Sequence, residues 1–413
     1  MKKIILTFIT SALMTIGTVA QNVNIPGTNF KDFLLANTFI NTNNDTEIQI
    51  TEAEAFSGSI SCSNLNISDL TGIEAFVNLV TLDCSQNNLT ALDLSQNTVL
   101  RILKCGLNDL GSLDLSNNPA LSYLDCSVSG LSTLDVSHNT QLTSITCSGN
   151  SLATLDLSNN TKLIYLYCNK NDLTMLNITQ CKDLDALDCT NNKFTNLDLS
   201  SNTSLTNISC YQNDLTTLNM SQNVLLSNIS CSNNKLEALD LSTNTSLLYL
   251  QCHSNNLTEL DLSNNTALQL LECYNNPFLT VLNLKNVDPT QNAYFKADNN
   301  QSLTCITVDD VELATSIWTE IDASTNFSLH CGVVGIDKTF LPNLSIFPNP
   351  AHSQLTIETD ARIKSVTVIN LTGEKKTIFT TNGSIDVSDL EEGVYFLQTE
   401  INGVLVSDKF TKE

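Results

Sequence analysis

Cysteine returns every 21 residues through the middle of the chain, and such a column of thiols could support several kinds of chemistry. Nucleophilic thiolates need a neighbouring base or cation, and zinc sites need closely spaced pairs of cysteine and histidine. The sequence around each cysteine supplies mainly Leu, Asn and Ser, without such pairs. The ten positions of the column are Cys84, Cys105, Cys126, Cys147, Cys168, Cys189, Cys210, Cys231, Cys252 and Cys273.

Disulfides within this column are a further alternative. Side chains stacked in register on parallel strands point the same way about 4.8 Å apart, whereas a disulfide needs closer Cβ atoms and a steep dihedral angle. We therefore predict free, buried thiols that pack as small hydrophobic groups. Cys62 precedes Cys84 by 22 residues and indicates a degenerate first turn. Beyond the column, we predict a disulfide between Cys305 and Cys331 that closes a cap over the last turn.

Tyrosine gathers beside the cysteine column. The positions three before, one before and one after each cysteine are expected to face outward, and they vary from turn to turn. Tyrosine joins apolar area to a polar tip and is common at binding surfaces, so these positions predict a ligand-binding face. The alternative is an idle exposed sheet that carries strand-forming residues. The predicted binding residues are Tyr123, Tyr165, Tyr167, Tyr211, Tyr249, His253 and Tyr274.

Residues 41–52, NTNNDTEIQITE, could bind calcium. They align with the oxygen-rich loop of an EF-hand, although an asparagine stands at the first loop position and Thr46 replaces the turn glycine. The hypothesis is a calcium site of modest affinity, and the alternative is a metal-free polar loop. No other cofactor is expected. The predicted calcium ligands are Asn41, Asn43, Asp45, Glu47 and Glu52.

A repeating frame, LxxLxCxxNxL followed by TxLDLSxNTx, positions the cysteine column and the tyrosines beside it. Apolar residues alternate with the period of a strand in both halves, which predicts two short parallel strands per 21-residue turn. Each turn then buries its leucines against its neighbours. Asparagines at the two bends can bond backbone groups of their own turn and the next. Cys181 and Ser129 each replace one of these asparagines.

This frame resembles the leucine-rich repeat, and its nested form is similar to the 21-residue IRREKO class of bacterial repeats. The segment ISDLTGIEAFVNL leads into the first regular turn much as in internalin-like arrays. The resemblance covers roughly residues 79–285. It implies a mainly β solenoid of about ten turns, with two short parallel strands per turn. The apolar spacing of NFKDFLLAN adds the expectation of a helical N-terminal cap.

One outward position of the second half-repeat is almost always acidic. Stacked carboxylates repel one another, so either bound cations or hydrogen bonds to neighbouring Ser, Thr and backbone groups must compensate; we favour the hydrogen bonds. Asn177 and Asn219 interrupt this aspartate column, and Asn283 takes the place in the last turn. The remaining members are Asp93, Asp114, Asp135, Asp156, Asp198, Asp240 and Asp261.

The net charge and the N-terminal targeting signal narrow the classes of function that the chain can have. The 413 residues carry a formal net charge of −24, which argues against nucleic-acid partners. Residues 1–20 join a basic start to a short apolar run and small residues before Gln21, which is typical of a secretory signal peptide. No other long apolar run follows, so we expect an exported chain without a transmembrane segment in its mature form.

The last 70 residues differ in composition from the repeats. Residues 344–413 alternate short strand-like runs with turns, which predicts a small β-sandwich. The motif FPNP at 347–350, GVYFLQ after DLEEG, and the terminal KFTKE resemble the type A C-terminal sorting domain of the type IX secretion system. The resemblance implies export by that machinery, followed by release or attachment at the cell surface.

These observations divide the chain into a signal peptide, a cap at 21–78, the solenoid at 79–285, a second cap at 286–332, a linker at 333–343 and the sorting domain. The sequence contains no recognisable nucleophile–base set or phosphate loop, so we predict a protein that is not an enzyme. The leading hypothesis is an adhesion or binding protein for an extracellular protein or glycan. The alternative is a structural coat or spacer without a dedicated ligand.

Overall fold

In the computed structural model the described residues are 21–331 except 293, and 345–413 except 359–362, 364, 371, 381–382 and 402–403. The chain divides after Cys331 into two compact units, and each is described by itself. The expected signal peptide and linker lie outside the described residues. The first unit is a solenoid, and its mainly β architecture confirms the predicted fold class. It has about 13 turns rather than the expected ten, because the strands at 59–61, 294–296, 305–307 and 326–328 add turns outside residues 79–285.

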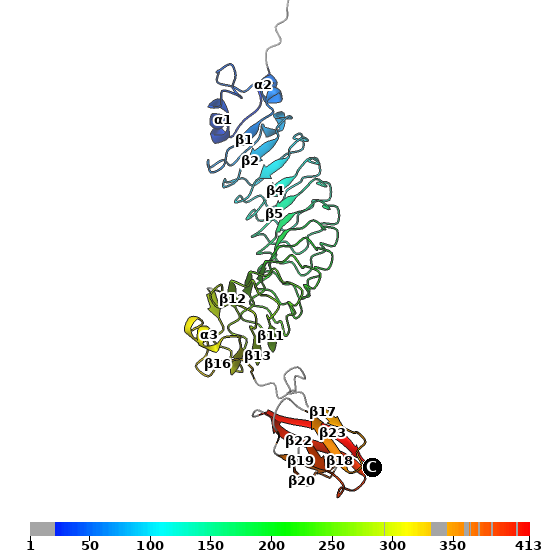
Figure 1. Cartoon of the computed structure of the whole chain (residues 1–413). Coiled ribbons are helices and arrows are strands. Elements are labelled where there is room, and N and C mark those ends of the chain that lie inside the picture. The colour runs from blue at the N-terminus through cyan, green and yellow to red at the C-terminus, as the bar shows by residue number, and fades with distance from the viewer. Residues whose placement is uncertain are drawn as a thin grey trace, which may run out of the picture. The chain divides into compact units, whose positions relative to one another are not determined.

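A 12-stranded parallel sheet runs the length of the solenoid, and we call it the long sheet (Figure 1). Each strand has three residues, of which the middle one is buried and apolar and points into the core. The strands are β1 (Ser59–Ser61), β2 (Thr81–Asp83), β3 (Ile102–Lys104), β4 (Tyr123–Asp125), β5 (Ser144–Thr146), β6 (Tyr165–Tyr167), β7 (Ala186–Asp188), β8 (Asn207–Ser209), β9 (Asn228–Ser230), β10 (Tyr249–Gln251), β12 (Leu270–Glu272) and β14 (Tyr294–Lys296).

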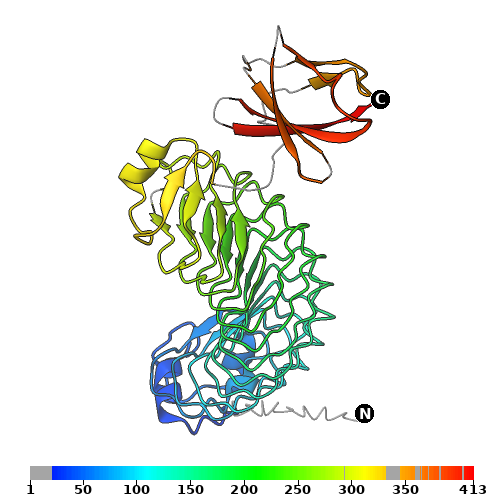
Figure 2. The same cartoon turned by 90° about the horizontal axis from the view of Figure 1, so that it is seen from below.

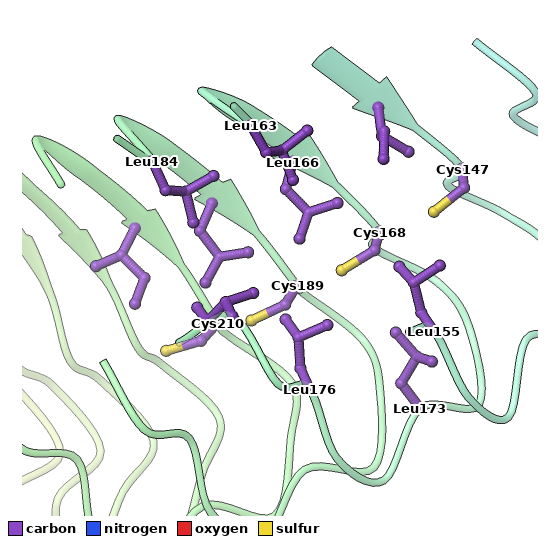
Figure 3. Packing of buried hydrophobic residues seen from close by; sticks show 14 of the residues in the cluster. Cys147, Leu155, Leu163, Leu166, Cys168, Leu173, Leu176, Leu184, Cys189 and Cys210 are labelled. Atoms are coloured by element: carbon purple, nitrogen blue, oxygen red, sulfur yellow. The ribbon is translucent and has the colours of Figure 1, made fainter. Parts of the chain in front are cut away.

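The cysteine column follows the strands of the long sheet. Figure 3 shows Cys147, Cys168, Cys189 and Cys210 in a row inside the core, packed among leucines of the same and neighbouring turns. All ten predicted members are fully buried free thiols, as expected. Cys62 joins them, because its backbone N–H donates to the carbonyl of Asp83 at 2.8 Å and continues the ladder. Thus the irregular 22-residue spacing still builds a rung of the same sheet.

The second half-repeats form fewer strands than expected. Only four strands assemble a second parallel sheet, and all lie towards the C-terminal end of the solenoid. In Figure 2 the solenoid curves with the long sheet on the inner side of the arc. In the middle of the solenoid, the second half-repeats pair at an isolated parallel bridge between Asp156 and Asn177. The four strands are β11 (Glu259–Asp261), β13 (Val281–Asn283), β15 (Cys305–Thr307) and β16 (Asn326–Ser328).

Asparagine columns tie the turns together at both bends. Asn171 donates from Nδ2 to the carbonyls of Cys147 and Cys168, and its Oδ1 accepts the N–H of Leu152 at 3.0 Å. At the other bend, Asn160 donates to the carbonyls of Val136 and Asn139, both at 3.1 Å. The amides therefore reach back to the preceding turn, where backbone acceptors would otherwise be buried without donors.

Short helices close both ends of the solenoid. The N-terminal cap contains α1 (Thr28–Leu35), α2 (Ile50–Ala55) and the 3₁₀ turn η1 (Ile73–Ala75). At the other end, α3 (Val311–Ile317) is followed by the buried Trp318, which stacks on Phe295 with ring centroids 4.7 Å apart. These aromatic side chains cover the leucines of the last turns.

The second unit consists of two antiparallel sheets around one core. Residues such as Leu355 and Ile385 from one sheet and Val368 and Leu397 from the other belong to the same buried cluster. The smaller sheet has the order β17 (Ser345–Phe347), β18 (Gln354–Glu358) and β21 (Ser384–Asp386). The larger sheet has the order β20 (Lys375–Phe379), β19 (Ser365–Asn370), β22 (Gly393–Ile401) and β23 (Val404–Lys412).

Candidate functional site

The side of the long sheet that faces solvent rather than the core carries most of the predicted binding residues, and we call it the outer face of the sheet. Within each three-residue strand the first and third side chains point away from the core, since strand residues alternate between faces. Tyr165, Tyr167, Tyr211 and Tyr249 are each 37–40% exposed, and the Tyr249 hydroxyl donates to Gln269 Oε1 at 3.2 Å. Tyr123, His253 and Tyr274 are half-buried on the same face or at its edge.

The strand register aligns several of these rings. The first residues of consecutive strands pair directly, so Tyr123 pairs with Ser144, and Ser144 pairs with Tyr165. The same line continues along the sheet to Tyr249, which pairs with Leu270. The structure therefore places Tyr123, Tyr165 and Tyr249 in one column. Tyr167, Tyr211 and Tyr274 lie in the neighbouring outward positions.

Three side chains form a packed cluster near the C-terminal end of this face. The His253 ring stacks on Tyr274 with centroids 4.2 Å apart, and the Lys296 ammonium lies 4.5 Å from the Tyr274 centroid. Burial lowers the pKa of His253 below its usual value, the nearby Glu272 carboxylate opposes this shift, and Lys296 adds to it. His253 is thus favoured as a neutral, flat ring that extends the aromatic surface.

Tyr294 belongs to this face, although the sequence prediction did not include it. It is 50% exposed and pairs with Leu270 of the preceding strand, which puts it in the same column as Tyr249. The three-residue longer turn and Ala297 in the cysteine position concealed this repeat. The signal was the segment YFKA, which keeps the Tyr-x-x-small pattern of the other strands.

The buried thiols do not have the environment of nucleophiles. Burial raises the pKa of Cys62, Cys147, Cys231 and Cys273 to about 12, and it raises the pKa of the other column members as well. A nucleophilic cysteine has a lowered pKa and an accessible sulfur. Separately, Cys305 and Cys331 form a disulfide that joins β15 to the end of the second cap.

The candidate calcium loop is closed by its own hydrogen bonds. Glu52 Oε1 accepts from the backbone N–H groups of Thr42 and Asn43, and Asp45 Oδ1 accepts from the N–H of Glu47. The Glu47 carboxylate pairs with Lys31 at 2.7 Å. Burial opposes ionisation of Glu52, but the hydrogen bonds that its carboxylate accepts from Gln49, Thr42 and Asn43 lower its pKa.

Asn41, the first loop residue, is buried, and its Nδ2 donates to the carbonyls of Leu35 and Asp45. Within the described residues no group of three or more His, Cys, Asp or Glu side chains is arranged to hold a metal ion. Calcium binding by residues 41–52 stays a prediction.

The aspartate column has local hydrogen bonds. Asp93 and Asp156 each accept the backbone N–H of the serine two residues later at 2.9 Å. This backbone bond, together with the serine side chain, lowers the pKa of each carboxyl. Asn219 makes the same contact to Ser221, so the contact does not need a charge. The geometry agrees with the hydrogen-bonded alternative, in which no cation compensates the column.

Two family models match separate parts of the chain. The model of the secretion system C-terminal sorting domain matches residues 345–413. The model of the leucine-rich-repeat domain of the endo-β-N-acetylglucosaminidase EndoS matches residues 42–160. Among the described helices, none has the length and apolar character needed to cross a membrane.

Internalins of Listeria monocytogenes are among the similar proteins. A solved functional domain of InlJ, which includes a cysteine ladder, is 25% identical with a TM-score of 0.58, and the match covers 95% of this chain and 100% of that one. An internalin InlF structure is 20% identical with a TM-score of 0.58, covers 77% of this chain and 100% of that one, and shows the fold alone.

A curated relative, Internalin J of Listeria monocytogenes serotype 4b, is 55% identical over 40 residues, which are 10% of this chain and 4% of that protein. The chain therefore matches only a small part of this relative's length. The repeat frame, the cysteine ladder, the solenoid and the matched sorting-domain model agree with one another. The chain is a leucine-rich-repeat protein of internalin-like fold that carries a C-terminal secretion-system sorting domain.

Proposed function

We propose that this chain is an exported, non-catalytic binding protein whose long sheet presents a ligand surface to an extracellular protein or glycan. The sorting domain indicates export by type IX secretion to the cell surface or beyond it. The internalin-like fold suggests surface binding or adhesion. The ligand, the binding residues and the absence of catalysis are the proposed parts.

One observation carries the proposal: the exposed tyrosines gather on one face, while the scaffold positions hardly vary. Tyr165, Tyr167, Tyr211 and Tyr249 all lie on the outer face of the long sheet or directly beside it. Large aromatic side chains dominate binding energy in many interfaces, because they bury much area with little loss of conformational entropy. A repeat protein can vary such positions without disturbing its core.

The structural alternative predicts that these rings have no ligand. A coat or spacer would need only the buried column, the asparagine bends and the caps, all of which are independent of the outward tyrosines. The same experiment separates the two functions, because replacement of the rings should remove binding only if a ligand uses them.

The test compares the purified chain with a variant in which Tyr165, Tyr167, Tyr211 and Tyr249 are changed to Ser. Both proteins are applied to arrays of glycans and extracellular-matrix proteins. We expect the variant to keep its thermal transition and to lose the array signals of the parent. A parent without any signal, or a variant that keeps all signals, would contradict the proposed binding face.

A matched control changes exposed apolar residues outside this face, namely Met175, Val224, Leu225 and Phe278, to Ser. These side chains are 47–71% exposed, so the control removes comparable exposed apolar area elsewhere. It should bind as the parent does. Loss of binding in the control would indicate a general effect of apolar surface and would remove the argument for the tyrosines.

A further inference from the structure

The first outward position of the long sheet carries tyrosine only on alternate strands. From β4 to β14 this position shows an ordered pattern, with each residue paired to the next through the parallel register. In order along the sheet the residues are Tyr123, Ser144, Tyr165, Ala186, Asn207, Asn228, Tyr249, Leu270 and Tyr294. We call Tyr123, Tyr165, Tyr249 and Tyr294 the tyrosine column.

The members of this column are separated by two, four and two strands. Adjacent strands lie about 4.7–4.9 Å apart, so two strands span about 9.4–9.8 Å. The side chains between them are smaller: Ser144 is buried beside its tyrosine neighbours, and Ala186 has only a methyl group. The exposed rings of Tyr165, Tyr249 and Tyr294 therefore form separate platforms at multiples of one length.

We propose that this column binds an extended, neutral β-1,4-linked polysaccharide that runs along the solenoid axis, with one sugar per strand. This inference rests on the proposed function and specifies its ligand. In such a polymer alternate sugar rings present the same face, and the length of its disaccharide unit is close to the span of two strands. Of the five sugars that present the same face to the sheet, four would meet a tyrosine ring, whose π-face attracts C–H groups, and the one on β8 would meet Asn207.

The neighbouring outward position supplies groups that bind hydroxyls. It carries Asp125 on β4, Asp188 on β7 and Gln251 on β10, all half-buried in the same sheet. Carboxylate and amide oxygens accept hydrogen bonds from sugar hydroxyls. The Gln251 amide already donates to Glu272 Oε2 at 2.7 Å, which fixes its orientation.

Charge favours a neutral polymer over an anionic one. The chain has a net charge of −24, and from β4 to β14 the row beside the tyrosine column contains three carboxylates, of Asp125, Asp188 and Glu272, against one ammonium, of Lys296. Uronic acids, sulfated sugars and nucleic acids would be repelled by this field. A neutral chain of hydroxyl-bearing rings meets no such penalty.

The first test measures the affinity of the full chain for glucose and N-acetylglucosamine oligomers, both β-1,4-linked, by calorimetry. Because each sugar matches one strand, affinity should rise with length until about nine sugars reach from Tyr123 on β4 to Tyr294 on β14. Carboxymethylcellulose, an anionic chain with the same β-1,4 linkage, should bind at least tenfold more weakly than cellulose oligomers. Affinity that does not change beyond two sugars, or preference for the anionic polymer, would overturn the inference.

The second test moves one ring by one strand without changing composition. In the variant Tyr249→Asn/Asn228→Tyr, the moved ring is separated from Tyr165 and from Tyr294 by three strands each. We expect about threefold to tenfold weaker binding of the nine-sugar oligomer, comparable to the contribution of one aromatic contact. Equal binding by parent and swap variant would overturn the two-strand period.

These outcomes distinguish the inference from the broader proposal. If the Ser variant of Tyr165, Tyr167, Tyr211 and Tyr249 loses binding of a protein ligand while no neutral oligomer binds the parent, the proposed binding face is supported and the polysaccharide ligand is contradicted. If that variant keeps every interaction of the parent, both the binding face and the polysaccharide ligand are contradicted. Circular dichroism melts of the swap variant must match the parent, since Asn228 and Tyr249 are both outward residues of adjacent strands.

Discussion

The Cys181 sulfur lies 3.7 Å from the carbonyl oxygen of Asn160, in a buried bend where the other regular turns place an asparagine amide. One turn later, Asn202 Nδ2 donates to the carbonyls of Ile178 at 3.0 Å and Cys181 at 2.8 Å. A thiol is a weak donor and can reach only one of the two acceptors. The turn at Cys181 is therefore a weak link in an otherwise continuous amide column.

Replacement of Cys181 by Asn should stabilise the solenoid. The new amide would reach the carbonyls of Leu157 and Asn160, by the same spacing that Asn160 uses towards Val136 and Asn139. We expect a gain of about 1 kcal/mol, because the column amides leave Oδ1 without a protein partner and so gain only through their donors. Urea denaturation of parent and variant measures this difference.

The converse variant, Asn202→Cys, provides the matched control. It removes two buried donors and should cost about 2–4 kcal/mol, since each buried acceptor left unpaired costs about 1–3 kcal/mol. Equal stability of both variants and the parent would show that the amide column contributes little.

The repeat can be predicted almost completely from the sequence, because the same buried and bend-forming residues recur in every turn. Leucine spacing, the buried cysteine and the bend asparagines each recur at one period, so chance matches cannot imitate them. The second strand of each turn was predicted too often, since apolar spacing alone does not reveal which half-repeats complete the hydrogen bonds of a ladder. Cys62, one residue out of step, is still recognisable as a degenerate first turn, whereas the position of Tyr294 is hidden by a turn that is three residues longer.

The candidate site can be predicted only in part from the sequence, because its residues occupy the outward positions that vary from turn to turn and do not follow the repeat. The outward positions of the cysteine strands could be identified from alternation, and the structure places their tyrosines on one face. The alternate-strand order of Tyr123, Tyr165 and Tyr249 becomes visible only when the register is known and Tyr294 is added.

The thiols of the cysteine column should not react in the native protein. Twelve free cysteines are buried, and their pKa values are raised by burial, which suppresses the reactive thiolate. We expect no labelling by iodoacetamide at pH 8 and twelve labels after denaturation without reductant, as counted by mass spectrometry. Fewer than twelve labels in the denatured chain would reveal disulfides within the column, and rapid native labelling would contradict the buried ladder.

Val128→Asn should relieve backbone strain. Val128 has φ +50°, in the left-handed region where a β-branched side chain is disfavoured, and its side chain is 48% exposed. The equivalent position two residues after the cysteine holds Asn191 with φ +53° and Asn233 with φ +54°. We expect a gain of about 1 kcal/mol in urea denaturation. The mirror change, Asn191→Val, should lose a similar amount; if neither variant changes stability, the strain is not significant.

Loss of the disulfide should loosen the second cap and leave the rest of the solenoid intact. The bond between Cys305 and Cys331 closes an interval of 26 residues that contains α3 and β16. Chain entropy assigns about 3.5 kcal/mol to a loop of this length. In the variant Cys305→Ala/Cys331→Ala, hydrogen exchange should accelerate in this interval but not at β6. Reductant should reproduce the effect in the parent and add nothing in the variant; equal exchange in all samples would contradict a stapling role.

Acidification should destabilise the C-terminal end of the binding face through His253. Burial lowers the pKa of this ring below the value of about 6.5 that it has in the unfolded chain. Between the lowered pKa and 6.5 the unfolded state binds more protons, so stability rises with pH across this window and falls as the pH drops through it. We expect His253→Gln to flatten the slope of unfolding free energy between pH 7 and pH 5, measured by urea denaturation. A slope unchanged by His253→Gln would assign the acid sensitivity to other groups, because the stacked ring on Tyr274 would then titrate as it does in the unfolded chain.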